Sequence, residues 1–331
     1  MNKLKKLYIE PSSLCNLNCT MCFRHGWIDE KQELMTTETR ERVIRSMPYC
    51  KDLETVMFAG MGEPLTHPEI FDMVADVSAL DISTHLLTNG TLLDRNRTDK
   101  LLKCGLDMLW VSVDGFSKES YEKIQLGSQY DLILENLSYF TAHKGNCKLG
   151  ITFVIMKENA DELCKINLFA DMLGADEINL SHAIPSVPTK EENTLYSRNV
   201  SVGKMIRFTK QNAERKLNFC PFVDEGVMFV KSNGDVCPCM QLLHSSYTYL
   251  FEERRKVISC SFGNVSENLL GDIWNEEPYR NFRKKVINFE FPDCTLCDGC
   301  DDRLENQTDC MFNSFPTCGA CLWAQGVARC P

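Results

Sequence analysis

The sequence has no long apolar run and no long run of basic residues. Its uninterrupted apolar stretches fall far short of the roughly 20 residues that a membrane-spanning helix needs. No run of lysine or arginine exceeds a few residues, and the formal net charge is −10, which argues against nucleic acid as the main partner. The basic start, Met1–Lys6, leads into Leu7-Tyr8-Ile9 without the apolar region of a signal peptide. We therefore expect a cytoplasmic protein that engages neither a membrane nor nucleic acid.

The sequence is, by contrast, rich in cysteine. Eighteen cysteines occur among 331 residues, of which 44% are hydrophobic, so the chain can bury a sizeable core and is long enough for two domains. Disulfides are disfavoured in the cytoplasm, and metal binding is the expected use of so many thiols. Three cysteines lie between positions 15 and 22 and eleven between 220 and 330. We expect the four scattered ones to be small buried hydrophobes: Cys50, Cys104, Cys147 and Cys164.

The first three cysteines, Cys15, Cys19 and Cys22, follow a short apolar strand at C-x3-C-x2-C spacing. Three thiolates at this spacing can hold three irons of a 4Fe–4S cluster, which normally has four cysteine ligands. The next cysteine is Cys50, so one iron is left open to bind and activate a small molecule. A zinc site or a chance cluster is the alternative, but zinc motifs typically pair two Cys-x2-Cys or Cys/His units, which this spacing fits poorly.

Strand-like and helix-like segments alternate from residue 4 to about 183. Six successive strand–helix units indicate a parallel sheet that is closed or partly closed into a TIM-like (βα)6 barrel, an α/β fold. We expect the barrel to occupy residues 1–210 and a small Cys-rich domain to occupy residues 211–331. The expected strands are Lys5–Ile9, Thr55–Ala59, Ile82–Thr88, Met108–Val113, Leu149–Met156 and Glu177–His182. The expected helices are Thr37–Arg45, Glu69–Ala79, Leu92–Cys104, Leu132–Thr141 and Asp161–Leu173, with caps at Thr36 or Thr37 and at Asp94 or Asn96.

Polar or glycine-rich motifs follow three of these strands. The second strand ends in Gly60-Met61-Gly62-Glu63-Pro64, the third in Thr88-Asn89-Gly90 and the fourth in Ser112-Val113-Asp114-Gly115. Small residues allow a ligand close to the backbone, and active sites of such barrels lie at the C-terminal ends of the strands. The motifs therefore predict a ring of polar groups around one mouth of the barrel. The candidate cofactor-binding residues are Gly60, Gly62, Glu63, Pro64, Asn89, Ser112 and Asp114.

Together with the cysteine triplet, these motifs resemble those of the radical S-adenosylmethionine (SAM) superfamily. The resemblance implies that Cys15, Cys19 and Cys22 hold a 4Fe–4S cluster whose open iron chelates SAM. It also implies that the Gly60–Pro64 turn meets the SAM amino group and that Ser112 contacts the ribose. An electron from the cluster would cleave SAM to a 5′-deoxyadenosyl radical, which takes a hydrogen atom from the substrate. The residue before the third cysteine is often aromatic or histidine in this superfamily but is Met21 here, so only its backbone is expected to contact the adenine.

The C-terminal segment combines a hairpin pattern with the later cysteines. Gly226–Lys231 is apolar and alternating, and Ser232–Asp235 reads as a turn that leads into Val236. Cys220, Gly234 and Cys239 resemble the opening of a SPASM domain, which holds one or two auxiliary 4Fe–4S clusters. Two clusters need about eight ligands, and a structural zinc ribbon is the alternative. Cys260 is set aside, and neighbouring Cys237 and Cys239 are not expected to serve together. The candidate ligands are Cys220, Cys239, Cys294, Cys297, Cys300, Cys310, Cys318, Cys321 and Cys330.

Two longer segments carry a narrower resemblance, to the radical SAM maturases associated with tungsten-containing aldehyde ferredoxin oxidoreductases. They are Tyr8–Ser12 with Cys22–Trp27, and Pro316–Gly326. The implied substrate is that protein or its pterin cofactor, with a ferredoxin or flavodoxin as electron donor.

Two alternative functions remain open. The first is a peptide-modifying enzyme that forms thioether or carbon–carbon links in a ribosomal peptide. Its relatives often carry an N-terminal peptide-binding extension, which this chain lacks because its first strand starts near residue 5. Sulfatase-maturing relatives place an aspartate base where this chain has Met240. The second alternative is a non-catalytic iron–sulfur electron carrier, which would leave the SAM-side motifs unexplained.

Three further residues attract attention near the predicted mouth. Arg24 and His25 follow the triplet and would either contact the substrate or the SAM carboxylate, or shield the cluster. His182 ends the sixth strand, where we expect a core histidine with satisfied hydrogen bonds.

Overall fold

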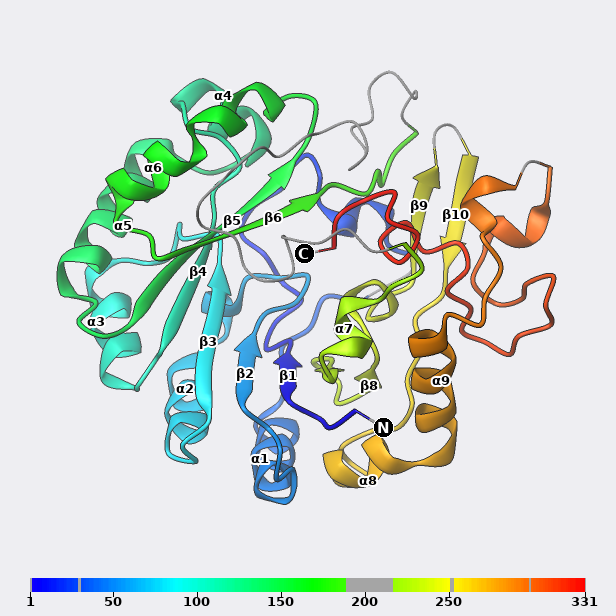
Figure 1. The fold of residues 1–331 in the computed structure, drawn as a ribbon. Helices are drawn as coiled ribbons and strands as arrows, with labels where there is room; N and C mark the ends of the chain where they lie inside the picture. Colours follow the sequence, from blue (N-terminus) through cyan, green and yellow to red (C-terminus); the bar gives the residue numbers. More distant parts are fainter. Residues whose placement is uncertain (1, 29–30, 189–216, 251–252, 298, 331) are drawn as a thin grey trace.

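The structure, a computed structural model, describes residues 2–28, 31–188, 217–250, 253–297 and 299–330. Its main feature is an eight-stranded sheet in the order β6-β5-β4-β3-β2-β1-β7-β8 (Figure 1). Strands β1 to β6 are parallel to their neighbours, as predicted for a barrel that does not close. The strands are β1 (Lys6–Ile9), β2 (Thr55–Phe58), β3 (Ser83–Thr88), β4 (Met108–Ser112), β5 (Lys148–Ile155), β6 (Glu177–His182), β7 (Val227–Val230), β8 (Val236–Cys237), β9 (Ser246–Leu250) and β10 (Glu253–Val257).

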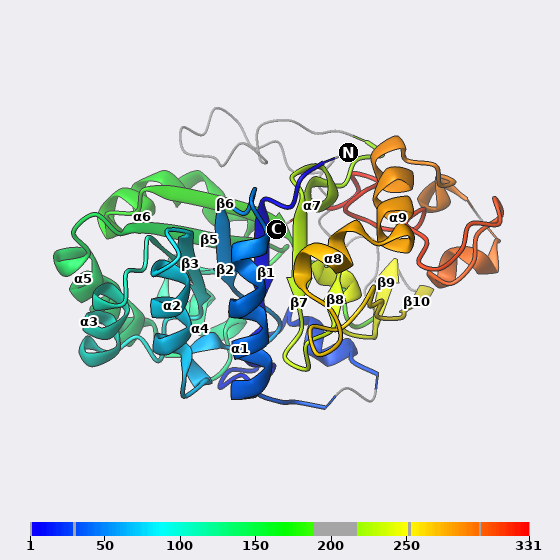
Figure 2. The same cartoon turned by 90° about the horizontal axis from the view of Figure 1, so that it is seen from below.

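The helices lie around the outside of the curved sheet and in the C-terminal segment (Figures 1 and 2). Thr36 accepts a hydrogen bond from the Thr39 amide at the start of α1, and Asp94 accepts one from the Arg97 amide at the start of α3. The helix expected over Asp161–Leu173 is divided into a 3-10 turn, Ala160–Lys165, followed by α6. The helices are α1 (Thr37–Ser46), α2 (Ile70–Ser78), α3 (Arg95–Lys103), α4 (Lys118–Ile124), α5 (Tyr130–His143), α6 (Ile166–Leu173), α7 (Pro221–Asp224), α8 (Leu270–Asn275) and α9 (Glu277–Asn288).

The two faces of the sheet pack against different partners. Because successive strand side chains point to opposite faces, Leu7 and Ile9 of β1 face the large core between sheet and helices. Tyr8, between them, packs instead with a small inner cluster that includes Met108 and Trp110. Glu10 is two residues after Tyr8, so its side chain points to the same inner face of the sheet, just after β1 ends. This placement puts a carboxylate at the mouth of the barrel.

The C-terminal segment continues the same sheet. Strand β7 runs parallel to β1, and β8 returns antiparallel to β7 after the predicted turn, where Gly234 has φ = +89°. All four residues of β7 are buried because Val227 and Phe229 face one core and Met228 and Val230 face another. The boundary expected at residue 210 lies outside the described residues. Within the ranges that the structure describes, no helix is long and apolar enough to cross a membrane.

Candidate active site and cysteine-rich centres

The cysteine triplet lies in the loop that follows β1. Cys15, Cys19 and Cys22 are half-buried and not disulfide-bonded. The loop is fixed at the end of α4, where the amides of Asn18 and Thr20 donate to the carbonyls of Leu126 and Ile124 at 3.0 and 2.9 Å. The three thiols are therefore presented by a loop whose backbone is tied to the barrel.

The triplet sulfurs act on one another electrostatically. Burial raises the pKa of the Cys19 thiol, and Asp114, Cys22 and Cys15 raise it further. Burial also raises the pKa of Cys22, while Arg24 opposes this rise. Cys19 and Cys22, whose ionisation is disfavoured by burial and by neighbouring thiols, need a nearby cation to become thiolates. Their chemistry suits an iron–sulfur cluster.

The turn after β2 packs directly on the triplet loop. The Glu63 amide donates to the Leu14 carbonyl at 2.7 Å. A Cβ at Gly62 would lie 2.3 Å from the Ser12 carbonyl oxygen and 2.5 Å from that of Leu14. Only glycine fits there without moving backbone. Gly60 has the same restriction on the other side, where a Cβ would lie 2.4 Å from the Cγ of Glu10.

Glu63 joins this turn to the end of β3. Its buried carboxylate accepts hydrogen bonds from the Thr88 hydroxyl and the Asn89 amide, both at 2.7 Å, and from the Leu65 amide at 3.0 Å. Burial raises the pKa of Glu63, and these three donors oppose the rise. The Asn89 side-chain amide in turn donates to Asn16 Oδ1 at 3.0 Å and lies 3.9 Å from Cys15 Sγ. The Glu63 carboxylate is thus a positioning group inside the fold, and Asn89 reaches the triplet.

Asp114 has the same kind of role after β4. Its buried carboxylate accepts from the Val154 amide and Gln125 Nε2, both at 2.7 Å, and from the Ser112 hydroxyl at 3.1 Å. Burial raises the pKa of Asp114, and these donors lower it. Gln125 Nε2 also donates to the Ser112 carbonyl at 3.1 Å. Ser112 is therefore held at the strand end by two buried partners, and sequence reasoning had not identified Gln125.

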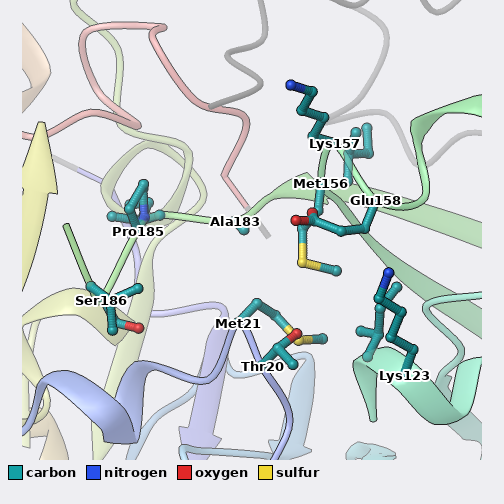
Figure 3. Close-up of a pocket in the computed structure, with 13 residues that line it drawn as sticks. Thr20, Met21, Lys123, Met156, Lys157, Glu158, Ala183, Pro185 and Ser186 are labelled. Carbon is teal, nitrogen blue, oxygen red and sulfur yellow. The ribbon is translucent and has the colours of Figure 1, made fainter. Parts of the chain in front are cut away.

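A pocket of about 330 Å³ opens beside the triplet loop. Figure 3 shows Met21 and Met156 pointing toward one another across it. Apolar side chains from α4, β5 and the segment after β6 form most of the remaining wall, and Lys123 and Glu158 stand at the rim. The Met21 side chain lines this pocket. The pocket is large enough for a small-molecule cofactor.

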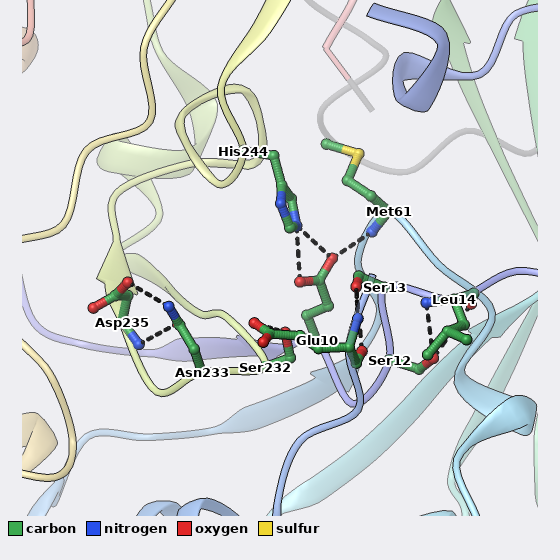
Figure 4. A network of polar contacts seen from close by, with 10 residues as sticks. Glu10, Ser12, Ser13, Leu14, Met61, Ser232, Asn233, Asp235 and His244 are labelled. Atoms are coloured by element: carbon green, nitrogen blue, oxygen red, sulfur yellow. Dashed lines mark hydrogen bonds and ion pairs between the residues drawn. The ribbon is translucent and has the colours of Figure 1, made fainter. Parts of the chain in front are cut away.

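A buried polar network is centred on the Glu10 carboxylate (Figure 4). Glu10 Oε1 accepts from the Met61 amide at 2.9 Å, and both carboxylate oxygens accept from His244 Nε2 at 3.0 and 2.9 Å. Trp27, five residues after the triplet, stacks on the His244 ring with centroids 4.5 Å apart. The network joins β1, the Gly60–Pro64 turn, the triplet loop and the C-terminal segment. Glu10 and His244 are far apart in the sequence, and their pairing had not been predicted.

The C-terminal cysteines form two groups. The first, here called the inner group, surrounds a small cavity of about 30 Å³ and has five members: Cys220, Cys239, Cys318, Cys321 and Cys330. Burial raises the pKa of every inner thiol, to about 12 for Cys220, and members of the group raise one another's values. These five thiols come from both ends of the segment and meet only in the folded chain.

The second group, here called the outer group, contains Cys294, Cys297 and Cys310, and Cys300 is assigned to it from its place in the sequence between Cys297 and Cys310. Burial raises the pKa of Cys294 to about 11, and Cys310 and Cys297 contribute to the rise. Cys297 and Cys310 are exposed. Cys237 and Cys260 are buried and do not line the inner group's cavity.

Within the described ranges, no three Cys, His, Asp or Glu side chains are arranged to hold one metal ion. In a 4Fe–4S cluster each cysteine binds a different iron, so this finding concerns sites for a single ion, such as zinc.

The remaining candidates have more ordinary surroundings. His25 Nε2 lies 2.9 Å from the Cys19 carbonyl, and the Arg24 guanidinium lies over the Trp27 ring at 5.8 Å, so both pack against the triplet loop. His182 is buried, and its Nδ1 accepts from the Arg329 amide at 3.3 Å. Among the scattered cysteines, Cys50 and Cys147 are buried and Cys104 is half-buried, but Cys164 is exposed, so the expectation for Cys164 was wrong.

Comparisons with protein families and with known relatives identify the family of this chain. The model of the radical SAM superfamily matches residues 9–170, and the SPASM model, an iron–sulfur cluster-binding domain, matches residues 220–301. The tungsten-containing aldehyde ferredoxin oxidoreductase cofactor-modifying protein of Pyrococcus furiosus is 30% identical over 99% of this chain and 97% of its own length. This chain belongs to the radical SAM superfamily. The AdoMet-dependent heme synthase of Methanosarcina barkeri is a more distant relative, 22% identical over 93% of this chain and 94% of its own.

Solved radical SAM structures share the fold. The structure of anSMEcpe with bound AdoMet superposes with a TM-score of 0.66 at 18% identity, covering 90% of this chain and 87% of that one. Streptococcus suis SuiB bound to S-adenosylmethionine gives 0.61 at 19% identity, covering 89% and 71%. The SPASM match ends at residue 301, before Cys310, Cys318, Cys321 and Cys330.

The protein is an enzyme, and its cofactors are SAM and 4Fe–4S clusters. The residues present fit both. The triplet offers three thiols that form no disulfide. Gly62 has no side chain, so none of its own atoms comes between its backbone and a ligand. The inner and outer groups offer enough further thiols for auxiliary clusters.

Proposed function

We propose that this radical SAM enzyme reductively cleaves SAM and abstracts hydrogen from a substrate in the maturation of a tungsten-containing aldehyde ferredoxin oxidoreductase or its pterin cofactor. When bound, the triplet cluster and SAM supply an electron and a carbon radical. The observation that carries the cleavage reaction is the convergence of the Gly60–Pro64 turn, Asn89 and the triplet loop at one barrel mouth, with Asn89 Nδ2 3.9 Å from Cys15 Sγ.

The proposed roles of the site residues follow from their surroundings. Cys15, Cys19 and Cys22 would hold the cluster. The backbone of the half-buried Gly60 and Gly62, with that of buried Pro64, would meet the amino-acid end of SAM, and the apolar pocket beside Met21 would take its adenine end. Glu63, Asn89, Ser112 and Asp114 would shape this site: Glu63 and Asp114 are buried and act by holding Asn89 and Ser112 in place.

The auxiliary clusters would occupy the two C-terminal groups. The outer group, Cys294, Cys297, Cys300 and Cys310, matches the four ligands of one 4Fe–4S cluster. The inner group holds five thiols, one more than a second cluster needs. A ferredoxin or flavodoxin would supply the electrons, and the high cysteine content favours a reducing cytoplasm as the location.

The proposed target rests on the relationship to the Pyrococcus furiosus protein, which covers nearly the whole of both chains. A peptide target is the alternative, because SuiB bound to its precursor peptide SuiA shares the fold at a TM-score of 0.61. That likeness is at 18% identity and concerns the fold alone.

The target can be tested by co-production. A tungsten-containing aldehyde ferredoxin oxidoreductase is produced with this protein or with its Cys15→Ala/Cys19→Ala/Cys22→Ala variant. The oxidoreductase is then purified, and both its released pterin and its intact chain are weighed by mass spectrometry. We expect a mass change in the pterin or the chain that requires the intact triplet. Identical masses in both samples would overturn the target while leaving the cleavage reaction standing.

A further inference from the structure

Arg255 is a buried cation between the two C-terminal cysteine groups. It lies in β10, is 3% exposed, and donates from Nε to the Arg303 carbonyl at 2.9 Å. Its Nη1 atom is buried without a hydrogen-bond partner. Among the residues that the structure describes, Arg255 has no carboxylate within ion-pair distance. A buried charge without a counter-charge is costly, and proteins normally pair it.

The charged groups that act on Arg255 are one cysteine of each group, which favour its charge, and Arg303, which opposes it. Burial lowers the pKa of Arg255 to about 10, and the thiolates of Cys321 and Cys294 raise it. Arg255 in turn lowers the pKa of both cysteines. Cys321 belongs to the inner group and Cys294 to the outer. The guanidinium remains charged at neutral pH and interacts electrostatically with one cysteine of each group.

The inner and outer cysteine groups lie next to each other at Gly319, which follows Cys318 in the sequence. The Cys294 amide donates to the Gly319 carbonyl at 3.2 Å, and a Cβ on Gly319 would lie 3.0 Å from Cys294 Sγ. Figure 1 shows β10 beside the orange segment of residues 301–304, which follows the outer group's Cys300. A second unpartnered donor, Nε2 of buried Gln241, lies on the inner side, where Gln241 Oε1 is 3.3 Å from Cys321 Sγ.

We propose that Arg255 is the shared counter-charge of the auxiliary clusters and raises their reduction potential by donating from Nη1 to a cluster or cysteine sulfur. This inference rests on the proposed assignment of the inner and outer groups. A thiolate-ligated cluster is negatively charged and gains a further negative charge on reduction, so a nearby cation stabilises the reduced form. Hydrogen bonds to the sulfurs act in the same direction. The side chain completes its own hydrogen bonding only when a cluster is present.

The test is a redox titration followed by electron paramagnetic resonance. The parent is the full-length Cys15→Ala/Cys19→Ala/Cys22→Ala variant, anaerobically reconstituted with iron and sulfide, so that every signal comes from auxiliary clusters. Arg255→Met and Arg255→Gln remove the charge, and Arg255→Lys keeps it. Arg283→Met is the matched control, because Arg283 is also a buried arginine with unpartnered nitrogens, but it is packed on Trp274 and Tyr279.

We expect Arg255→Met and Arg255→Gln to shift at least one midpoint potential to more negative values. Arg255→Lys should stay closer to the parent, and Arg283→Met should match it. Full iron content with unchanged midpoints in Arg255→Met would overturn the inference, as would an equal shift in Arg283→Met. If Arg255→Met loses iron, the comparison is made between the other two variants. Equal midpoint potentials in Arg255→Gln and Arg255→Lys would then overturn the inference. A parent without any cluster signal would instead overturn the auxiliary sites themselves.

Discussion

His244 Nε2 lies 2.9 Å from Glu10 Oε2, and the two side chains are 2% and 1% exposed. Glu10 directly follows the first strand, five residues before Cys15, and His244 belongs to the C-terminal segment. The same carboxylate accepts from the amide of Met61, in the turn proposed to meet SAM. This contact therefore fixes the C-terminal segment against the mouth of the barrel.

We expect Glu10→Ala to destabilise the protein by about 1–3 kcal/mol, because removing the carboxylate leaves the buried His244 ring and Met61 amide without their hydrogen-bond acceptor. Urea denaturation under anaerobic conditions measures this loss. The matched control is Glu54→Ala, since Glu54 forms a surface ion pair with Lys5 at 3.1 Å and should contribute less than about 1 kcal/mol. Equal losses in the two variants would show that the buried pair has no special role.

His85 should make stability fall in mild acid. Burial lowers its pKa to about 4, and Lys6 adds to this effect. The unfolded chain, with a histidine pKa of about 6.5, takes up a proton first as the pH falls, so stability is lost between about pH 6.5 and 4. At pH 5 the loss from this group is about 2 kcal/mol. Urea denaturation at pH 7.5 and 5 should show that His85→Gln lacks this part of the loss, and an unchanged pH dependence would contradict the assignment.

Gly62→Ala should disturb the proposed SAM turn without removing the cluster. The added Cβ would lie 2.3 Å from a backbone oxygen that no side-chain rotation can move. We expect iron content like that of the parent and at least a tenfold weaker SAM affinity in equilibrium binding, on the order of 1.4 kcal/mol or more. Gly271→Ala is the control, because its nearest contact would be an ordinary 3.7 Å. SAM affinity that is equal in both variants would remove Gly62 from the site.

The two auxiliary groups should lose iron separately. Cys220→Ala/Cys239→Ala should remove the iron of one cluster, and Cys297→Ala/Cys310→Ala that of another. Cys164→Ala should remove none, because Cys164 is exposed and remote in sequence from both groups. Iron analysis after anaerobic reconstitution gives the counts. The assignment would be wrong if one pair of substitutions removed both clusters or neither.

The parts of this protein that depend on local sequence could be predicted. The six parallel strands, the caps Thr36 and Asp94 and the turn at Gly234 all follow from patterns within a few residues. Helix α4 was missed because it is only seven residues long, although Ser117 and Ser120 form a capping box at its start.

The parts that depend on contacts between distant segments could not be predicted. The inner group joins Cys220 to Cys330, and the buried pair joins Glu10 to His244 across 234 positions. No local pattern distinguishes the cysteines of one cluster from those of another, because the spacing constrains only neighbours in sequence. The position of Arg255 between the groups has the same origin.

The most direct test of the central claim is the reductive cleavage of SAM. Anaerobically reconstituted enzyme is incubated with SAM and dithionite, and 5′-deoxyadenosine is measured by liquid chromatography with mass spectrometry. We predict that the parent forms 5′-deoxyadenosine and that the Cys15→Ala/Cys19→Ala/Cys22→Ala variant, which should keep its auxiliary iron, forms none. Absence of 5′-deoxyadenosine from enzyme with full iron content would contradict the proposed reaction.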